Sequence, residues 1–164
     1  MSVLRGVGLG RRYGSGQIAV EALAGVDVEV RAGRLTVVRG PSGSGKTTLL
    51  NLLGGLDRPT SGRVLLGDDV LSELSEAELA AARRDRIGYV FQNFGLIPVL
   101  SAAENVEVPL RLRRMERGQR DERVAEVLEL VGLTRHAGQR PGELSGGQQQ
   151  RVGSSAMSTS GRAT

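Results

Sequence analysis

At 164 residues the chain is long enough for one domain with a hydrophobic core but short for two. It has no cysteine, which excludes disulfides and thiolate metal sites, and no apolar run reaches the ~20 residues that span a bilayer. The net charge is +4, yet the arginines are interleaved with acidic residues, and two tyrosines and two phenylalanines make no stacking surface for nucleic acid. The N-terminus lacks the pattern of a secretory signal.

The first part of the chain is predicted to form β structure. Residues 18–24 and 26–30 include alternating apolar and polar positions, with glycines between and after them. The apolar run at 35–39 is predicted as a further strand, and a helix-favouring run at 48–53 follows it after a short loop. Gly54 and Gly55 are expected to end that helix.

The loop between this strand and helix reads Gly-Pro-Ser-Gly-Ser-Gly-Lys-Thr at residues 40–47. Lys46 is the only lysine in the chain, and it completes the pattern G-x-x-x-x-G-K-T of a phosphate-binding loop. A compact ammonium can lie between β- and γ-phosphate oxygens, whereas a planar guanidinium is too wide. A strand before the loop and a helix after it are the context that this motif requires. The sequence therefore favours a nucleotide phosphate site over a glycine-rich turn with a chance lysine.

The remaining helices are predicted mainly from capping boxes, in which a serine is followed three residues later by Glu or Gln. These boxes are Ser75 with Glu78, Ser101 with Glu104, and Ser145 with Gln148. A further helix is predicted over 121–131 from apolar residues at helical spacing. Short strands are predicted at 63–66 and at 87–91, and the latter is apolar enough for a buried strand of a parallel sheet. Residues 153–164 lack apolar periodicity and are predicted to be disordered.

The second strong motif is Leu-Ser-Gly-Gly-Gln at residues 144–148. By itself it predicts a helix start with exposed backbone N–H groups, which is a natural anion site. Together with the phosphate loop, it resembles the signature of ATP-binding subunits of ABC transporters, over about residues 3–152. The stretches 51–62 and 89–94 look like the lipoprotein-releasing and macrolide-export branch of that family.

The resemblance implies an α/β fold of the P-loop NTPase class. Residues 1–152 would form an incomplete ABC-type nucleotide-binding domain, with an N-terminal antiparallel β region and a helical subdomain at about 93–151. The segment 153–164 would be a divergent tail.

The resemblance also implies which residues bind ATP and Mg²⁺. The residues assigned to the nucleotide are Tyr13, Gly40, Pro41, Ser42, Gly43, Ser44, Gly45, Lys46, Thr47, Thr48 and Gln92. Tyr13 would lie against adenine, and Lys46 would contact the β- and γ-phosphates. Thr47 and Gln92 would bind Mg²⁺. The signature residues would bind the γ-phosphate held by a second subunit, and they are Leu144, Ser145, Gly146, Gly147 and Gln148.

Two protein partners follow from the resemblance: a second ATP-binding subunit in a head-to-tail dimer, and a transmembrane permease subunit. The protein would be cytoplasmic and peripheral on the inner face of the cell membrane, in contact with the membrane only through the permease. No nucleic-acid partner is expected.

The chain departs from the family pattern after the signature. No apolar run ending in Asp-Glu follows Val152, the last acidic residue is Glu143, and His136 precedes the signature and so cannot be the switch histidine. We assign no catalytic residue and expect negligible ATP hydrolysis by this chain alone. The alternatives are a binding-only or non-functional truncated remnant, an ABC-type ATPase acting on DNA, and a phosphate-loop kinase, in which the signature would have no use.

Overall fold

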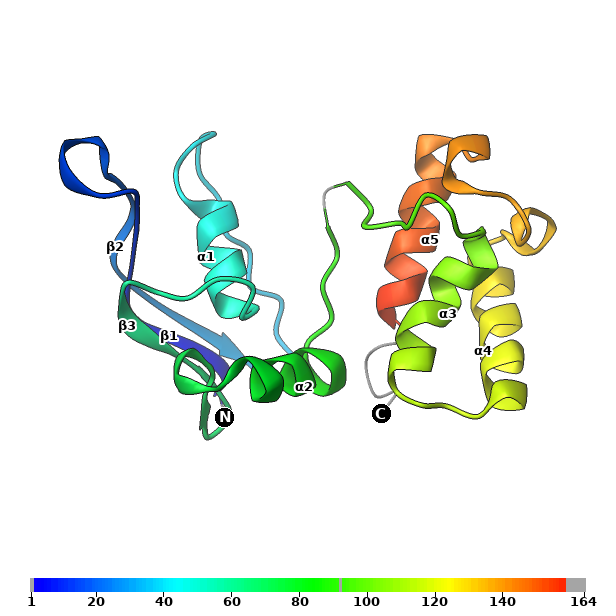
Figure 1. The fold of residues 1–164 in the computed structure, drawn as a ribbon, viewed down its shortest axis with the longest axis horizontal. Helices are drawn as coiled ribbons and strands as arrows, with labels where there is room; N and C mark the ends of the chain where they lie inside the picture. The colour runs from blue at the N-terminus through cyan, green and yellow to red at the C-terminus, as the bar shows by residue number, and fades with distance from the viewer. Residues whose placement is uncertain (1, 92, 159–164) are drawn as a thin grey trace. The chain divides into compact units, whose positions relative to one another are not determined.

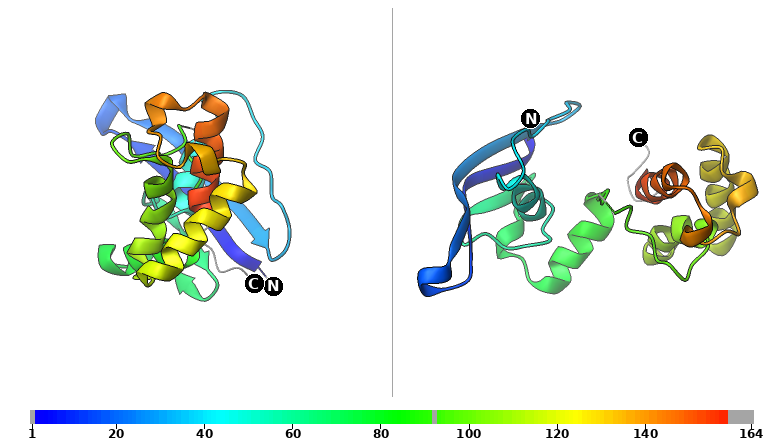
Figure 2. Two further views of the ribbon diagram at one scale, coloured as in Figure 1. Left: turned by 90° about the vertical axis from the view of Figure 1, so that its right-hand side faces the viewer. Right: turned by 90° about the horizontal axis from the view of Figure 1, so that it is seen from above.

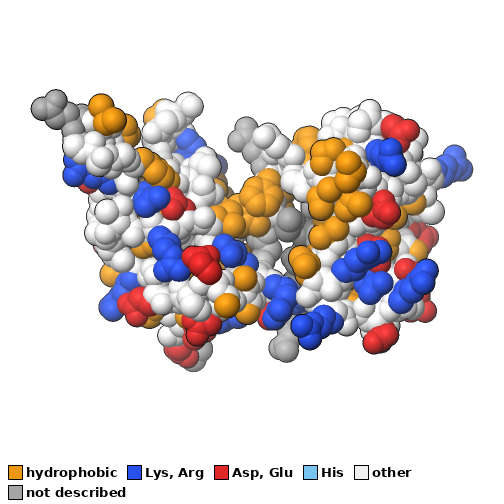
Figure 3. All heavy atoms as spheres, viewed as in Figure 1, with side chains coloured by type: hydrophobic (Ala, Val, Ile, Leu, Met, Phe, Trp, Pro, Cys, Tyr) orange, Lys and Arg blue, Asp and Glu red, His pale blue; other side chains and the backbone are white. Residues whose placement is uncertain are grey.

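The computed structural model describes residues 2–91 and 93–158, and the chain divides after Ala80 into two compact units. The first unit carries the β structure and the second is helical (Figures 1 and 2). Each unit has its own buried core. Figure 3 shows basic and acidic side chains interspersed over the face that it presents.

The first unit contains a four-stranded antiparallel sheet with the strand order β2-β1-β3-β4. The strands are β1 (Ser2–Tyr13), β2 (Val20–Arg31), β3 (Ser61–Leu66) and β4 (Asp69–Val70). The short 3-10 turns η1 (Gly16–Ile18) and η2 (Leu71–Glu73) follow β1 and β4. In the β1–β2 pair, Arg11 lies opposite Leu23 and Tyr13 lies opposite Val20. The predicted antiparallel β region and the strand at 63–66 are therefore confirmed.

Helix α1 (Lys46–Leu53) packs on strands β1 and β2. Its inward face carries Leu49, Leu52 and Leu53, all of which are buried. Helix α2 (Glu76–Arg86) begins at the predicted capping box. There the Ser75 N–H donates to the Glu78 carboxylate at 2.9 Å, and the Glu78 N–H donates to the Ser75 hydroxyl at 3.4 Å. Local capping thus sets where this helix begins.

Two predicted strands do not form. Residues 35–39 and 87–91 are without secondary structure, and none of the described strands pairs with either run. Leu35 is 91% exposed and Val37 is 59% exposed. Apolar strands of this kind are stabilised by neighbours on both sides and by cover on both faces. The described residues supply neither, so the expected parallel sheet is absent from them.

The second unit is built from α3 (Ala102–Leu112), α4 (Arg117–Leu130) and α5 (Gly146–Ser158), with the short turns η3 (Thr134–His136) and η4 (Pro141–Glu143) between α4 and α5. The core consists of Ala102, Val106, Leu110, Val124, Val127, Leu128, Leu133, Leu144 and Val152. The capping box at Ser101 and Glu104 is complete. Helices α3 and α4 lie within the range 93–151 predicted for a helical subdomain, whereas α5 extends beyond it to Ser158.

The prediction of disorder for 153–164 is wrong for its first part, because α5 continues to Ser158. Small residues make this possible without apolar periodicity. Gly153 is so close to Phe94 that an added Cβ would lie 2.5 Å from the Phe94 carbonyl oxygen, and Ala156 is buried. Residues 159–164 lie outside the described residues. Of the helices described, none combines the length and the apolar character needed to cross a membrane.

Candidate nucleotide-binding site

The phosphate-loop motif forms an open loop that ends at the first turn of α1. Gly43 and Gly45 have φ angles of 79° and 82°, a left-handed conformation that favours glycine. Gly45 is the N-cap residue of α1, and the described residues provide no side-chain hydrogen bond that caps this end of the helix. The first backbone N–H groups of α1 are therefore left without a side-chain acceptor, as an anion site at a helix N-terminus requires.

Gly45 also fixes the loop against the sheet. A Cβ at this position would lie 2.5 Å from the Ala22 carbonyl oxygen and 2.9 Å from Leu23 Cδ2. A backbone oxygen cannot move aside as a side chain can. The close approach therefore requires glycine, and it anchors the end of the loop to β2.

The Lys46 ammonium lies over the loop and donates to the loop's own oxygens. Its Nζ is 3.0 Å from the Gly40 carbonyl, 2.6 Å from the Pro41 carbonyl and 3.4 Å from the Ser44 hydroxyl. None of the ion pairs within the described residues involves Lys46. Its charge is thus held at the centre of the loop and is available to an anion, which would replace these neutral acceptors with stronger ones.

Thr47 and Thr48 occupy the first turn of α1, where Thr47 is exposed and Thr48 is half-buried. The described residues contain no cluster of three or more His, Cys, Asp or Glu side chains that could bind a metal ion. Mg²⁺ is commonly held by few protein ligands, with phosphate oxygens and water completing its shell. An exposed Thr47 hydroxyl beside the phosphate loop fits such an arrangement.

Tyr13 lies at the end of β1 and is 39% exposed. Its hydroxyl donates to Asp57 Oδ2 at 2.8 Å, and the Arg11 guanidinium lies 4.5 Å from the centre of its ring. Hydrogen bonding to Tyr13 and the Asp57 carboxylate raise the pKa of Arg11, so the guanidinium stays charged. Arg11 is opposite Leu23, which borders Gly45. Tyr13 is therefore linked to the phosphate loop through one strand pair.

The predicted signature forms the first turn of α5 in the second unit. The Ser145 N–H donates to Gln148 Oε1 at 2.7 Å, and the Gln148 N–H donates to the Ser145 hydroxyl at 3.3 Å, so the predicted box is present. Ser145, Gly146 and Gly147 are exposed, whereas Leu144 is buried. The structure therefore presents the signature backbone at a surface.

Sequence reasoning missed two residues that hold the signature in place. Gln149 donates to the carbonyls of Pro141 and Leu144 at 2.9 and 3.0 Å. His136 Nε2 lies 3.0 Å from Gln148 Nε2. Because Gln148 Oε1 already accepts from Ser145, the amide nitrogen faces His136 and the imidazole Nε2 accepts. The sequence only excluded His136 as the switch histidine, whereas the structure places it at the end of η3 in contact with Gln148.

The structure brings the residues of the phosphate loop together and links Tyr13 to them, while the signature belongs to the other unit. Gln92 lies outside the described residues, so its predicted contact with Mg²⁺ stays a prediction. Asp57, which binds both Tyr13 and Arg11, was not identified from the sequence. A carboxylate placed soon after a helix is too common a feature to have revealed it.

Comparisons with known proteins agree on one family. Residues 23–160 match the sequence model of the family described as ABC transporter. An uncharacterised ABC transporter ATP-binding protein of Thermotoga maritima is 49% identical over 140 residues, which cover 85% of this chain and 60% of that protein. The macrolide export ATP-binding/permease protein MacB of Hyphomonas neptunium is 46% identical over 142 residues, which cover 87% of this chain and 22% of that protein.

A solved structure is also similar. It is that of the ATP-binding cassette MJ0796, dimeric and bound to ADP and Pi in a post-hydrolysis state. It matches with a TM-score of 0.88 and 40% sequence identity over 94% of this chain and 68% of that one. The chain thus spans less than two thirds of the two curated relatives. Since the family match covers most of the chain and includes both the phosphate loop and the signature, the chain belongs to the ABC transporter family.

Proposed function

We propose that this chain is the ATP-binding part of an ABC transporter and that it binds ATP with Mg²⁺ to drive transport through a separate membrane subunit. The observation that carries the proposal is the phosphate loop itself. An ammonium bound only by neutral loop oxygens, left-handed glycines and a helix N-terminus without a side-chain cap converge on one exposed loop. Together they form a site for a highly charged anion such as a triphosphate.

Different residues of the first unit would bind different parts of the triphosphate. Backbone N–H groups from Ser42 to Thr47 surround the phosphates, and the Lys46 ammonium exchanges its carbonyl partners for β- and γ-phosphate oxygens. The Thr47 hydroxyl would hold Mg²⁺ beside the phosphates. The ion would supply positive charge that offsets the negative charge of the phosphates. Tyr13 contacts the base.

The signature serves the site of a second subunit. Support comes from the exposed backbone of Ser145, Gly146 and Gly147, and from the dimeric state of the similar cassette MJ0796. A permease partner is supported by relatives that are named ATP-binding/permease proteins. We infer a head-to-tail dimer in which each phosphate loop meets the signature of the other copy, with membrane contact made through the permease.

Hydrolysis is a separate question from binding. Phosphoryl transfer needs a positioned water and a supported metal ion as well as bound phosphates. The phosphate loop accounts for the bound phosphates, and the function proposed for this chain is therefore the binding of ATP with Mg²⁺.

Calorimetric titration with ATP and Mg²⁺ tests the proposal. Lys46→Ala removes the ammonium at the loop centre and is expected to weaken ATP binding about tenfold to a hundredfold, since a charged hydrogen bond contributes ~1.5–3 kcal/mol. Arg34→Ala, which removes an exposed cation just outside the loop, is the matched control and should leave binding unchanged. Equal affinities of the parent chain and Lys46→Ala would refute the proposal.

A further inference from the structure

The carboxylate of Asp57 is the centre of a polar cluster that includes Tyr13. Its Oδ2 accepts from the Tyr13 hydroxyl at 2.8 Å and from Arg11 Nε at 2.9 Å. Its Oδ1 accepts from Arg11 Nη2 at 2.8 Å and from the Arg58 backbone N–H at 2.8 Å. Both oxygens are thus engaged, and the bidentate pairing with Arg11 has the geometry that makes such pairs specific.

The same cluster fixes the Tyr13 ring by its edge and by one face. The hydroxyl is tied to Asp57, and the Arg11 guanidinium covers a face of the ring at 4.5 Å from its centre. The side chains of Arg11 and Asp57 are only 24% and 23% exposed. Tyr13 nevertheless remains 39% exposed. The ring therefore keeps an open face in a restrained orientation.

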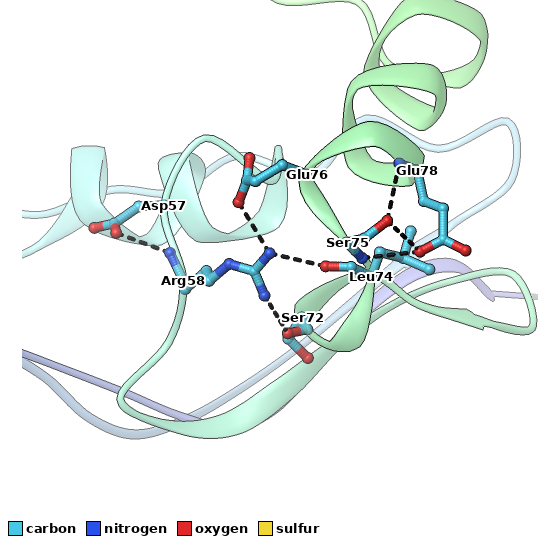
Figure 4. A network of polar contacts seen from close by, with 7 residues as sticks. All are labelled: Asp57, Arg58, Ser72, Leu74, Ser75, Glu76 and Glu78. Atoms are coloured by element: carbon cyan, nitrogen blue, oxygen red, sulfur yellow. Dashed lines mark hydrogen bonds and ion pairs between the residues drawn. The ribbon is translucent and has the colours of Figure 1, made fainter.

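Asp57 is itself held rigidly at the end of α1. Its backbone N–H and that of Leu56 both donate to the Asn51 carbonyl in the last turn of the helix, at 3.3 and 2.8 Å. The next residue, Arg58, is fixed in turn by the segment that leads into α2, as Figure 4 shows. Its guanidinium donates to the carbonyls of Ser72 and Leu74 at 3.2 and 2.8 Å and pairs with Glu76 at 2.9 Å. Asp57 thus has little freedom to move.

One helix therefore connects two parts of the candidate site. The N-terminus of α1 presents the phosphate loop, and the turn after its C-terminus carries the carboxylate that restrains Tyr13. We propose that Asp57, together with Arg11, is a positioning residue that sets the Tyr13 ring relative to the phosphate loop, so that a nucleobase stacks on the open face of the ring. The proposal rests on the proposed function and names the ligand as a nucleoside triphosphate, recognised by its base as well as its phosphates.

The chemistry of the cluster defines what Tyr13 can offer to a base. Its hydroxyl proton is donated to Asp57, so the side chain offers a base its π face and no free hydrogen-bond donor. The guanidinium on the opposite face keeps that side from the ligand. Base–aromatic stacking depends on the ring lying parallel to the base. Loss of the restraint should therefore weaken nucleotide binding while phosphate binding is preserved.

The test compares two ligands, ATP and inorganic tripolyphosphate, each titrated with Mg²⁺ against the full chain. Tyr13→Phe keeps the aromatic face but removes the hydroxyl that binds Asp57, and Asp57→Asn removes the charge that pairs with Arg11. Both variants are expected to bind ATP about threefold to tenfold more weakly, as for the loss of one charge-assisted hydrogen bond at a partly exposed site. Both should bind tripolyphosphate as the parent chain does.

Asp68→Asn is the matched control, since it makes the same substitution at an exposed carboxylate in the turn between β3 and β4, and it should change neither affinity. Unchanged ATP binding by Tyr13→Phe and Asp57→Asn, or an equal loss for ATP and tripolyphosphate, would overturn the positioning role. Lys46→Ala separates this outcome from failure of the proposed function, because it should weaken both ligands. If it weakens neither, the phosphate site and the inference that rests on it are both wrong. Should Asp57→Asn not fold, Tyr13→Phe alone decides.

Discussion

Substituting alanine for Gly45 tests whether contact with β2 holds the phosphate loop in place. Gly43→Ala is a matched control, because the two glycines have nearly the same φ, 79° and 82°, but different surroundings. A Cβ at Gly43 would meet nothing within 4 Å, whereas one at Gly45 would lie 2.5 Å from the Ala22 carbonyl oxygen. The pair of variants therefore separates backbone strain from steric conflict.

The expected losses in the free energy of unfolding follow from backbone strain and from steric conflict. A left-handed alanine costs ~1–2 kcal/mol, and both variants carry that cost. Gly45→Ala adds a conflict with a backbone oxygen that only a shift of α1 or β2 can relieve, and such overpacking costs ~1–3 kcal/mol more. We expect Gly43→Ala to lower the free energy of unfolding by ~1–2 kcal/mol and Gly45→Ala by ~2–5 kcal/mol.

Urea denaturation followed by circular dichroism measures both values, with the slope showing whether the unfolded states are comparable. ATP titration of the same samples should show the larger loss of affinity for Gly45→Ala, because its loop is displaced from β2. Equal destabilisation by the two substitutions would refute the reasoning, since it would mean that the contact with Ala22 does not constrain the loop.

Three further predictions concern the helical unit. Asn105→Ala removes a buried amide that bonds the loop ahead of α3 through four contacts, and it should lower the free energy of unfolding by ~1–3 kcal/mol in urea denaturation. Hydrogen bonding to Arg111 lowers the pKa of Glu107. The ionised Glu107 therefore stabilises the fold above about pH 4.5, and this stabilisation is lost as pH falls through the lower folded-state pKa. In Glu107→Gln, the free energy of unfolding should fall less steeply with decreasing pH in this acid range. Gly153→Ala should lower the thermal midpoint, because its Cβ would meet the Phe94 carbonyl oxygen at 2.5 Å.

Each of these predictions has its own control. Gln119→Ala, on the exposed surface of α4, should be nearly neutral beside Asn105→Ala. Glu122→Gln makes the same change as Glu107→Gln at an exposed position and should leave this pH dependence unchanged. Gly118→Ala lies in α4 with open space around it, so it should stabilise by up to ~1 kcal/mol. A rise in thermal midpoint for Gly153→Ala as well would contradict the packing argument.

The features that the sequence predicted correctly depend on residues close together in the chain. The capping boxes at Ser75, Ser101 and Ser145 join residues three apart, so a short pattern is sufficient to specify them. The phosphate loop is likewise one continuous segment, and its two left-handed glycines need no distant partner. The family followed from such local motifs, and it is confirmed.

The features that the sequence could not settle depend on distant partners. Residues 35–39 and 87–91 have the composition of strands, but a strand exists only where another segment pairs with it, and composition does not reveal whether one does. Helix α5 extends to Ser158 because small residues fit against a neighbouring backbone, and the linear pattern does not contain that fit.

Tyr13 illustrates the difference between features set by local sequence and features set by distant partners. The sequence shows that residue 13 is aromatic, and this suggested a base-binding role. Its hydrogen bond to Asp57, however, joins residues 44 positions apart, which the sequence does not reveal. That bond exists because β1 and the turn after α1 meet in space, as does the bond from Arg11 to the same carboxylate. Local hydrogen bonds and backbone preferences thus determined the helix starts and the phosphate loop. Only tertiary packing decided which strands form and which carboxylate restrains the ring, because those interactions join segments far apart in the chain.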